Sequence, residues 1–574
     1  MQMILLPKYE QILSDTPCTI LDYVCCIGRR LTLQLCTHFM YEELQDEQQN
    51  VIEFWGNYFC HENRQFAQDV ICKILELSNS NRVSIIHTQN LYMLIEAALS
   101  AEVHEDILPI PSNAKLEQLF FKALLAANNV ILKKQSEGLN ETENFFSSNP
   151  SINKIPILIL TNQLAYGDYE FALNDEVVVT QLYKCVYFFN FVEQHYPKHL
   201  KHYLNEKGFK DWKEYIKVLC GLVFKAIKKK KGHTLINIQS ENNDNVINCC
   251  LQLCSTTIYE YHKDLDFIEL RNHPLFRWNE NDFLILSNLF LSEKLYQSIY
   301  FDLKLINDKL LPPDRIDEFK AKVGLEFSER ILLYEVLNRL FRDNIVKKTG
   351  VEIENVVGDG GCDYYARSGN KVYIFECKDI LMPKQVKTSY NASIISEFLY
   401  DRLVQSKAKR KAVMQLLQNI QFIRDNKIEP YRTDGAKMTI YPVIVTHHRV
   451  FDTPVINHLI NYWFQQKLQG MDIVNKDRIK PIVIINVDTL IVMKDLCHQK
   501  SIALKVLMDK YISTVLRNDK LAMRNSYLIK CIMIFFQHIN FQKELIILQR
   551  CCLKSHNIMG LRIKHSYRNI LIFC

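Results

Sequence analysis

Three charged residues, two acidic and one basic, stand in an otherwise apolar pair of strand-like segments. Asp363 begins the segment 363–367, and Glu376 and Lys378 end the segment 372–378. Two neighbouring carboxylates repel each other unless a cation lies between them, and Mg²⁺ or Mn²⁺ suits such oxygen ligands. The ion polarises a phosphodiester and activates a bound water. The lysine would stabilise the developing negative charge or, with a depressed pKa, deprotonate that water. These residue types predict metal-dependent phosphodiester hydrolysis.

The spacing between the two segments predicts that their acidic residues face each other. The dipeptide at 369–370 is Gly-Asn, and both residues tolerate the positive φ of a two-residue hairpin turn. A tight turn pairs Ser368 with Lys371, and counting outward from that pair places Asp363 opposite Glu376. Opposed residues share one face of the sheet, as does the lysine two positions beyond Glu376.

Two other acidic positions compete with this assignment. Asp359 has the same parity as Asp363, but it lies beyond a Gly-Gly pair and outside a tight hairpin, so we favour Asp363. A second Glu-x-Lys occurs at 318–320, after Pro313-Asp314. Its acidic residues are four apart in a helix-like stretch, where no hairpin brings two strands together.

The segments around the hairpin alternate between helical and strand-like patterns. After Pro312-Pro313 we expect, in order, a helix at 327–341, strands at 346–357, 363–367 and 372–378, a helix at 393–426, a strand at 438–446, a helix at 455–468 and a strand at 481–487. This order predicts an α/β domain over residues 324–496, with a mixed central sheet flanked by helices.

This arrangement resembles the PD-(D/E)xK, or restriction-endonuclease-like, nuclease superfamily. An Asp at the start of one strand and a Glu-x-Lys at the end of the next follow that pattern, although Cys362 replaces the usual proline. Members often carry a Glu on the preceding helix and a Gln or Lys on the following helix. The resemblance implies that the two strand carboxylates bind Mg²⁺ or Mn²⁺. The catalytic residues it implies are Asp363, Glu376, Lys378, Glu335 and Gln415.

A basic stretch follows the second strand of the hairpin and leads into the next helix. It lies where a phosphate backbone would approach the acidic pair, and only Glu397 and Asp401 oppose it. A solvated helix face is the alternative interpretation. The residues expected to contact nucleic acid are Lys384, Lys387, Lys407, Lys409, Arg410 and Lys411.

The remainder of the chain is predicted to be mainly α-helical. We expect a helical N-terminal region at 1–135, a polar linker near 135–150, a second helical region at 155–320 and a helical tail at 497–574. The large helical part before the nuclease-like domain would serve recognition, regulation or assembly, either between copies of the chain or with a partner protein.

Composition restricts the class of protein. With 48% hydrophobic residues and a formal net charge of +6 over 574 residues, the chain is globular, and its charge permits a nucleic-acid partner without requiring one. Many of its 18 cysteines lie in apolar, helix-like stretches, and its first residues lack the pattern of a secretory signal. We therefore expect free thiols and a cytoplasmic location. The apolar stretch 527–539 is too short and too interrupted to span a membrane.

These observations predict a Mg²⁺-dependent nuclease, with DNA as the expected substrate. By analogy with the nucleases that the chain resembles, the expected role is antiviral defence or DNA processing in a microbe. One alternative is a protein that uses a nuclease-like fold to bind nucleic acid or a partner without cutting it. Another is an RNA nuclease, because the residues of the hairpin do not distinguish the two nucleic acids.

Overall fold

The computed structural model describes residues 4–516, apart from 41–45, 48–49, 79–81, 104–111, 150–151, 153, 171–173, 229–233, 239–243, 256–260, 262–264, 408, 430–433 and 499–502. Its described part divides into two units, each built from separate stretches of sequence. Unit 1 contains 1–138 and 201–302, and unit 2 contains 139–200 and the chain from 303 onward. The four consecutive regions expected from the sequence do not correspond to these interleaved units. Residues 517–574 of the predicted helical tail lie outside the described part.

Unit 1 is mainly helical, as predicted. Its helices are α1 (Tyr9–Ile12), α2 (Ile20–Ile27), α3 (Arg29–Phe39), α5 (Val51–Tyr58), α6 (Arg64–Ser78), α7 (Thr88–Leu99), α13 (Trp212–Lys228), α14 (Asp244–Gln252), α15 (Ile268–Asn272) and α16 (Asn288–Glu293). It also contains a parallel pair, β1 (Ile4–Leu5) with β2 (Arg82–Val83), and a sheet of β3 (Leu235–Asn237), β5 (Asp282–Ile285) and β4 (Leu275–Arg277). Neither of these strand pairings was predicted.

Three helices contain the points at which the sequence passes from one unit to the other: α8 (Asn113–Ser148), α12 (Pro197–Lys207) and α17 (Gln297–Lys309). The predicted linker near 135–150 is therefore wrong, because α8 continues through it as far as Ser148. A glycine such as Gly138 costs a helix about 1 kcal/mol. Burial of Phe145 and Phe146 in the core of unit 2 offsets that cost.

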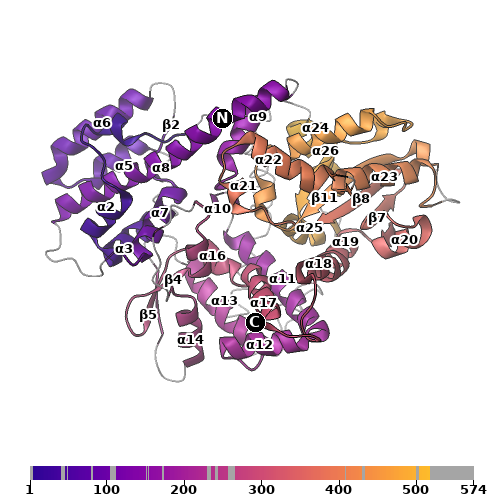
Figure 1. Cartoon of the computed structure of the whole chain (residues 1–574), viewed down its shortest axis with the longest axis horizontal. Helices are drawn as coiled ribbons and strands as arrows, with labels where there is room; N and C mark the ends of the chain where they lie inside the picture. Colours follow the sequence, from indigo (N-terminus) through magenta and orange to yellow (C-terminus); the bar gives the residue numbers. More distant parts are fainter. Residues whose placement is uncertain are drawn as a thin grey trace. The chain divides into compact units, whose positions relative to one another are not determined.

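Unit 2 contains the predicted mixed sheet (Figure 1). Its strands are β6 (Val346–Thr349), β7 (Tyr364–Ser368), β8 (Lys371–Lys378), β11 (Thr439–Thr446) and β12 (Val483–Asn486), in the spatial order β12-β11-β8-β7-β6. The pairs β6–β7 and β7–β8 are antiparallel, whereas β8–β11 and β11–β12 are parallel. The fold class is thus confirmed as a mixed sheet with helices.

The helices of unit 2 surround this sheet. They are α9 (Lys154–Gln163), α10 (Gly167–Glu170), α11 (Asn174–His195), α18 (Phe319–Val323), η2 (Gly324–Leu333), α19 (Tyr334–Leu340), α20 (Gly350–Val357), α21 (Lys384–Lys387), α22 (Ala392–Leu399), η3 (Tyr400–Val404), α23 (Ala412–Arg424), α24 (Ile456–Gln469), α25 (Val487–His498), α26 (Leu504–Tyr511) and η7 (Ile512–Leu516). The elements η2, η3 and η7 are π-helical.

Two predicted elements differ from the structure. The strand expected at 346–357 ends at Thr349, where α20 begins. Thr349 and Glu352 form a capping box that satisfies free backbone amides at the start of this helix. The long helix expected at 393–426 is interrupted by a short hairpin of β9 (Gln405–Ser406) and β10 (Lys409–Arg410).

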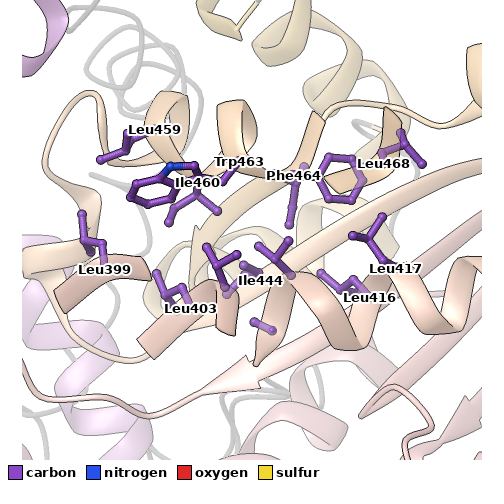
Figure 2. Packing of buried hydrophobic residues seen from close by; sticks show 14 of the residues in the cluster. Leu399, Leu403, Leu416, Leu417, Ile444, Leu459, Ile460, Trp463, Phe464 and Leu468 are labelled. Atoms are coloured by element: carbon purple, nitrogen blue, oxygen red, sulfur yellow. The ribbon is translucent and has the colours of Figure 1, made fainter. Parts of the chain in front are cut away.

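The main core of unit 2 lies between the sheet and helices α22 to α24. Ile444 of β11 packs in one cluster with Leu403 of η3 and Phe464 of α24 (Figure 2). The opposite face of the sheet carries aromatic rings, among them Tyr373 and Phe375, which contact Phe341 after α19. The strands are therefore buried on both faces, and polar groups concentrate where the strands end.

Among the described residues, no helix is both long and apolar enough to cross a lipid bilayer.

Candidate active site

The β7–β8 hairpin brings the predicted charged residues together. Ser368 pairs with Lys371 and Tyr364 with Phe375, so the predicted register is confirmed and Asp363 lies one position beyond the last of these pairs, opposite Glu376. Asp363 Oδ2 accepts a hydrogen bond of 2.6 Å from the Cys377 amide. Glu376 is fully buried, and its Oε1 accepts a hydrogen bond of 2.7 Å from Lys378 Nζ.

The carboxyl groups of this site have raised pKa values, because the positive charge near them does not compensate for burial. Burial and the charge of Asp363 raise the pKa of Glu376 to about 8, and burial also raises the pKa of Asp363. The same two causes raise the pKa of a third carboxyl, Glu329 of η2, to about 8. Glu376 Oε2 is buried and has no hydrogen-bond partner among the described residues. A buried carboxylate oxygen without a partner is costly, and a bound cation would remove that cost.

Lys378 is held as a cation. Burial alone would lower the pKa of this lysine, but the charges of Glu376 and Asp363 outweigh burial and raise it. A lysine with a raised pKa keeps its proton at neutral pH, so the alternative in which Lys378 deprotonates the attacking water is not supported. The arrangement favours the other predicted role, stabilisation of negative charge by a fixed ammonium.

The donor set fits a hard divalent cation bound by two carboxylates. No three Asp, Glu, His or Cys side chains in the described ranges converge closely enough to hold a metal ion by themselves. Mg²⁺ does not require such a set, because it commonly keeps several waters and binds one or two carboxylates together with substrate phosphates. Asp363 and the unpartnered oxygen of Glu376 would supply those two carboxylates.

The loop before β7 places Asp363 rather than Asp359 at the site. Asp359 is exposed, whereas Asp363 faces the hairpin strand. Asn419 of α23 fixes the loop between them: its Oδ1 accepts a hydrogen bond of 2.8 Å from the Cys362 amide, and its Nδ2 donates one of 2.9 Å to the Gly360 carbonyl. Sequence analysis missed Asn419, because its position one helical turn after Gln415 has meaning only once α23 is packed against the loop.

Replacing Asn419 with alanine is expected to destabilise the chain by about 1–3 kcal/mol, because it leaves two buried backbone groups without partners. The loss should appear as a lower midpoint of urea unfolding. Gln421→Ala is a suitable control, because Gln421 bonds only to the exposed Asp425 on the same helix. Equal midpoints for the two variants would show that Asn419 does not hold the loop.

Glu329, not Glu335, is the helical glutamate beside the hairpin. Glu335 of α19 is exposed, and its Oε1 accepts a hydrogen bond of 3.1 Å from Tyr187 Oη. Glu329 is influenced by the charges of Asp363 and Lys378. The two glutamates thus have different surroundings, one beside the charges of the hairpin and the other against Tyr187. The described structure therefore does not bring Glu335 to the predicted site.

The second predicted supporting residue also lacks a polar contact with the hairpin. Gln415 lies on α23, the expected helix, and is half-buried. Its backbone carbonyl accepts a hydrogen bond from Asn419, but its side chain bonds to no other described residue. A role for Gln415 remains a prediction from the resemblance.

A cleft of about 1040 Å³ opens beside the end of β8. Lys378, Cys377 and Glu329 line it next to the hairpin, and α18 forms part of its wall. Its basic lining residues are Lys304, Arg315, Lys320, Lys378, Arg402 and Lys409, and its acidic ones are Asp308, Asp317, Glu318, Glu329 and Asp379. The cleft thus reaches the hairpin at Lys378 and Glu329, whereas Asp363 and Glu376 are not among its lining residues.

Only one of the six lysines and arginines predicted to bind nucleic acid lines this cleft, namely Lys409. Lys387 is buried and forms an ion pair of 2.8 Å with Asp168, so its prediction as a surface contact is wrong. Arg410 donates a hydrogen bond to Gln418.

The other three predicted contacts do not reach the cleft lining. Lys384 and Lys407 are exposed, and Lys411 is half-buried before α23.

The histidine pair after β11 supports the residue that follows Lys378. In the parallel register Thr446 pairs with Lys378, so the histidines reach Cys377 and Asp379. His447 Nε2 lies 3.2 Å from Cys377 Sγ, and His448 Nε2 lies 3.1 Å from Asp379 Oδ1.

Asp379 is fixed from a second side as well. Its Oδ2 accepts a hydrogen bond of 2.7 Å from Ser328 Oγ of η2. Burial alone would raise the pKa of Asp379, but the His448 hydrogen bond and the charge of His447 lower it. The two histidines and Ser328 thus anchor the end of β8.

Comparisons of the chain with models of protein families, with curated proteins and with solved structures found no match. The class of this protein therefore rests on the geometry and chemistry of the hairpin and the cleft beside it.

Proposed function

We propose that this protein is a metal-dependent nuclease of the PD-(D/E)xK type. The observation that carries the proposal is the fully buried Glu376, whose unpartnered Oε2 lies on the hairpin face shared by Asp363 and Lys378. A buried cluster of charge is retained at a cost unless a ligand uses it. The cluster also borders a cleft large enough for a segment of nucleic acid.

Each residue of the hairpin has a distinct part in this proposal. Asp363 and Glu376 would hold Mg²⁺ or Mn²⁺, which when bound polarises a phosphodiester and activates a water. Lys378 keeps its proton and stabilises the negative charge that develops on the phosphate oxygens. Glu329 of η2, which is close enough to interact with Asp363 and Lys378, would take the supporting role that the resemblance assigned to Glu335.

The substrate expected from the sequence is DNA, and the expected setting is the cytoplasm of a microbe, in defence or DNA processing. Free thiols at all described cysteines are compatible with a reducing compartment. Binding without cutting is the second candidate function, favoured by one observation: the described lining of the cleft includes Lys378 and other cations but neither Asp363 nor Glu376.

Cleavage assays on the full chain test this proposal. Plasmid, linear duplex, single-stranded DNA and RNA are each incubated with Mg²⁺, Mn²⁺ or a chelator. We expect at least one substrate to be cut with either ion, and none with the chelator. Binding of nucleic acid without cutting under every condition would favour the second function, and cutting unaffected by the chelator would contradict the metal-dependent mechanism.

A further inference from the structure

The cleft beside Lys378 carries cations that are far apart in sequence. Lys320 belongs to α18, Arg402 to η3 and Lys409 to β10, and all three line the same space as Lys378. Lys320 lies in the second Glu-x-Lys, which the sequence analysis set aside. Its importance here comes from the position of α18 against the cleft and not from that motif.

Lys320 and Arg402 are close enough to affect each other. Burial lowers the pKa of Lys320, the Asp379 carboxylate opposes that change, and the charge of Arg402 lowers the pKa further. Within the described part of the chain, the side chain of Lys320 makes no hydrogen bond or ion pair, and neither does that of Lys409. Arg402 has a loose contact of 3.7 Å with the neighbouring Asp401, and its guanidinium lies over the ring of Phe398, 5.9 Å from the ring centroid. Two like charges held together with so little compensation would be stabilised by an anion between them.

The remaining lining residues restrict what kind of anion enters. Asp317 and Glu318 are exposed acidic residues of the same cleft, and they would repel a second phosphate backbone lying beside the first. Phe319 is the only aromatic residue in the lining and is buried, so the described lining has no exposed ring on which a base would stack. Contacts with phosphates, which carry no sequence information, are what this lining provides.

We propose that the cleft binds a single strand of nucleic acid through its backbone, with Lys320 and Arg402 holding a phosphate next to the one at Lys378. This inference extends the proposed function, since it concerns the same site. It assigns the substrate class, an unpaired strand of DNA or RNA read without base specificity. It also assigns the main contacts to α18 and η3, outside most of the basic stretch predicted from the sequence.

Binding in the absence of divalent metal tests the inference separately from cleavage. Fluorescence anisotropy of labelled mixed-sequence single strands, DNA and RNA, and of the corresponding duplex is measured with the full chain in a chelator over a range of salt. The test variant is Lys320→Ala/Arg402→Ala. The matched control is Lys427→Ala/Lys437→Ala, which removes two exposed lysines that are not among the lining residues of the cleft.

We expect the single strands to bind more tightly than the duplex. The test variant should lose about tenfold or more in affinity, and the slope of log affinity against log salt should become shallower by about 0.7, because the loss of one phosphate contact on a single strand removes about that much. The control should stay within about twofold of the wild type. Lys320→Arg, which keeps the charge, should bind like the wild type and shows that loss in the test variant is not a folding defect.

Three results would overturn the inference: equal binding by the test variant and the wild type, tighter binding of the duplex, or no binding of any strand by the wild type. Different results would refute the inference and the proposed function. Strand binding that depends on Lys320 and Arg402, without hydrolysis in Mg²⁺, would refute only the nuclease. If the wild type hydrolyses nucleic acid but the test variant binds as tightly as the wild type, only the assignment of phosphate contacts to Lys320 and Arg402 is refuted.

Discussion

Glu376→Gln is expected to abolish metal-dependent cleavage, with a loss on the order of 10³-fold or more. The metal contributes several kcal/mol of transition-state stabilisation, and each 1.36 kcal/mol corresponds to a factor of ten in rate. Glutamine keeps the shape of the side chain but is a poor ligand for Mg²⁺. The measurement is the initial rate of cleavage on whichever substrate the wild type cuts. A variant that cuts within tenfold of the wild-type rate would remove Glu376 from the mechanism.

The same substitution should stabilise the protein when metal is absent, and the gain should depend on pH. The folded-state pKa of Glu376 is about 8, well above its ordinary value of 4.5, so between these values the folded state binds a proton that the unfolded chain releases. The contribution of this group is therefore fully present below about pH 4.5 and is lost as pH rises towards 8. Urea midpoints measured in a chelator should favour Glu376→Gln over the wild type more at pH 8 than at pH 5. A difference that does not change with pH would contradict the raised pKa.

Lys378→Met is expected to have the second-largest effect, because it removes the charge that Glu376 and Asp363 share. Breaking one side of a buried ion pair costs about 3–5 kcal/mol. We expect about 3 kcal/mol at pH 8, since uptake of a proton by Glu376 relieves part of the cost. Cleavage should also be lost, because the fixed ammonium that stabilises the negative charge of the transition state is gone.

A second substitution separates stability from catalysis at this pair. Lys378→Met/Glu376→Gln should recover most of the lost stability, because the fully buried carboxylate of Glu376 is no longer left without its lysine, yet it should not recover cleavage. Lys73→Met removes one partner of an exposed pair with Glu76 and should change stability by less than about 1 kcal/mol. If the double variant is as unstable as Lys378→Met, the two side chains do not act as a pair.

Local pattern was enough to predict the centre of the candidate site. The Gly-Asn turn and the two-residue period of strands fix which residues of a hairpin face each other, so Asp363, Glu376 and Lys378 follow from counting. The order of strands and helices in the mixed sheet was predictable for the same reason. The capping box of Thr349 and Glu352, which begins the helix at 350–357, is also a local sequence pattern. The prediction missed it because the residues that follow are typical of a strand.

Features that depend on packing between distant segments were not predictable. The sequence offers both Glu329 and Glu335 on one helical stretch, and the path of π-helical η2 against β8 decides between them. The link from His448 to Asp379 requires the parallel β8–β11 register. Arg402 lay within the predicted basic stretch, but its neighbour Lys320 is more than eighty residues earlier, and only the folded chain places both in one cleft.

The most direct test of the central claim compares Asp363→Asn with Asp359→Asn in the same cleavage assay with Mg²⁺ or Mn²⁺. The two substitutions remove the same charge four residues apart, one facing Glu376 and the other exposed on the preceding loop. If the hairpin carboxylates hold the metal, Asp363→Asn loses metal-dependent cleavage and Asp359→Asn keeps it. Equal rates for both variants and the wild type, or a loss confined to Asp359→Asn, would contradict the assignment of this hairpin as the active site.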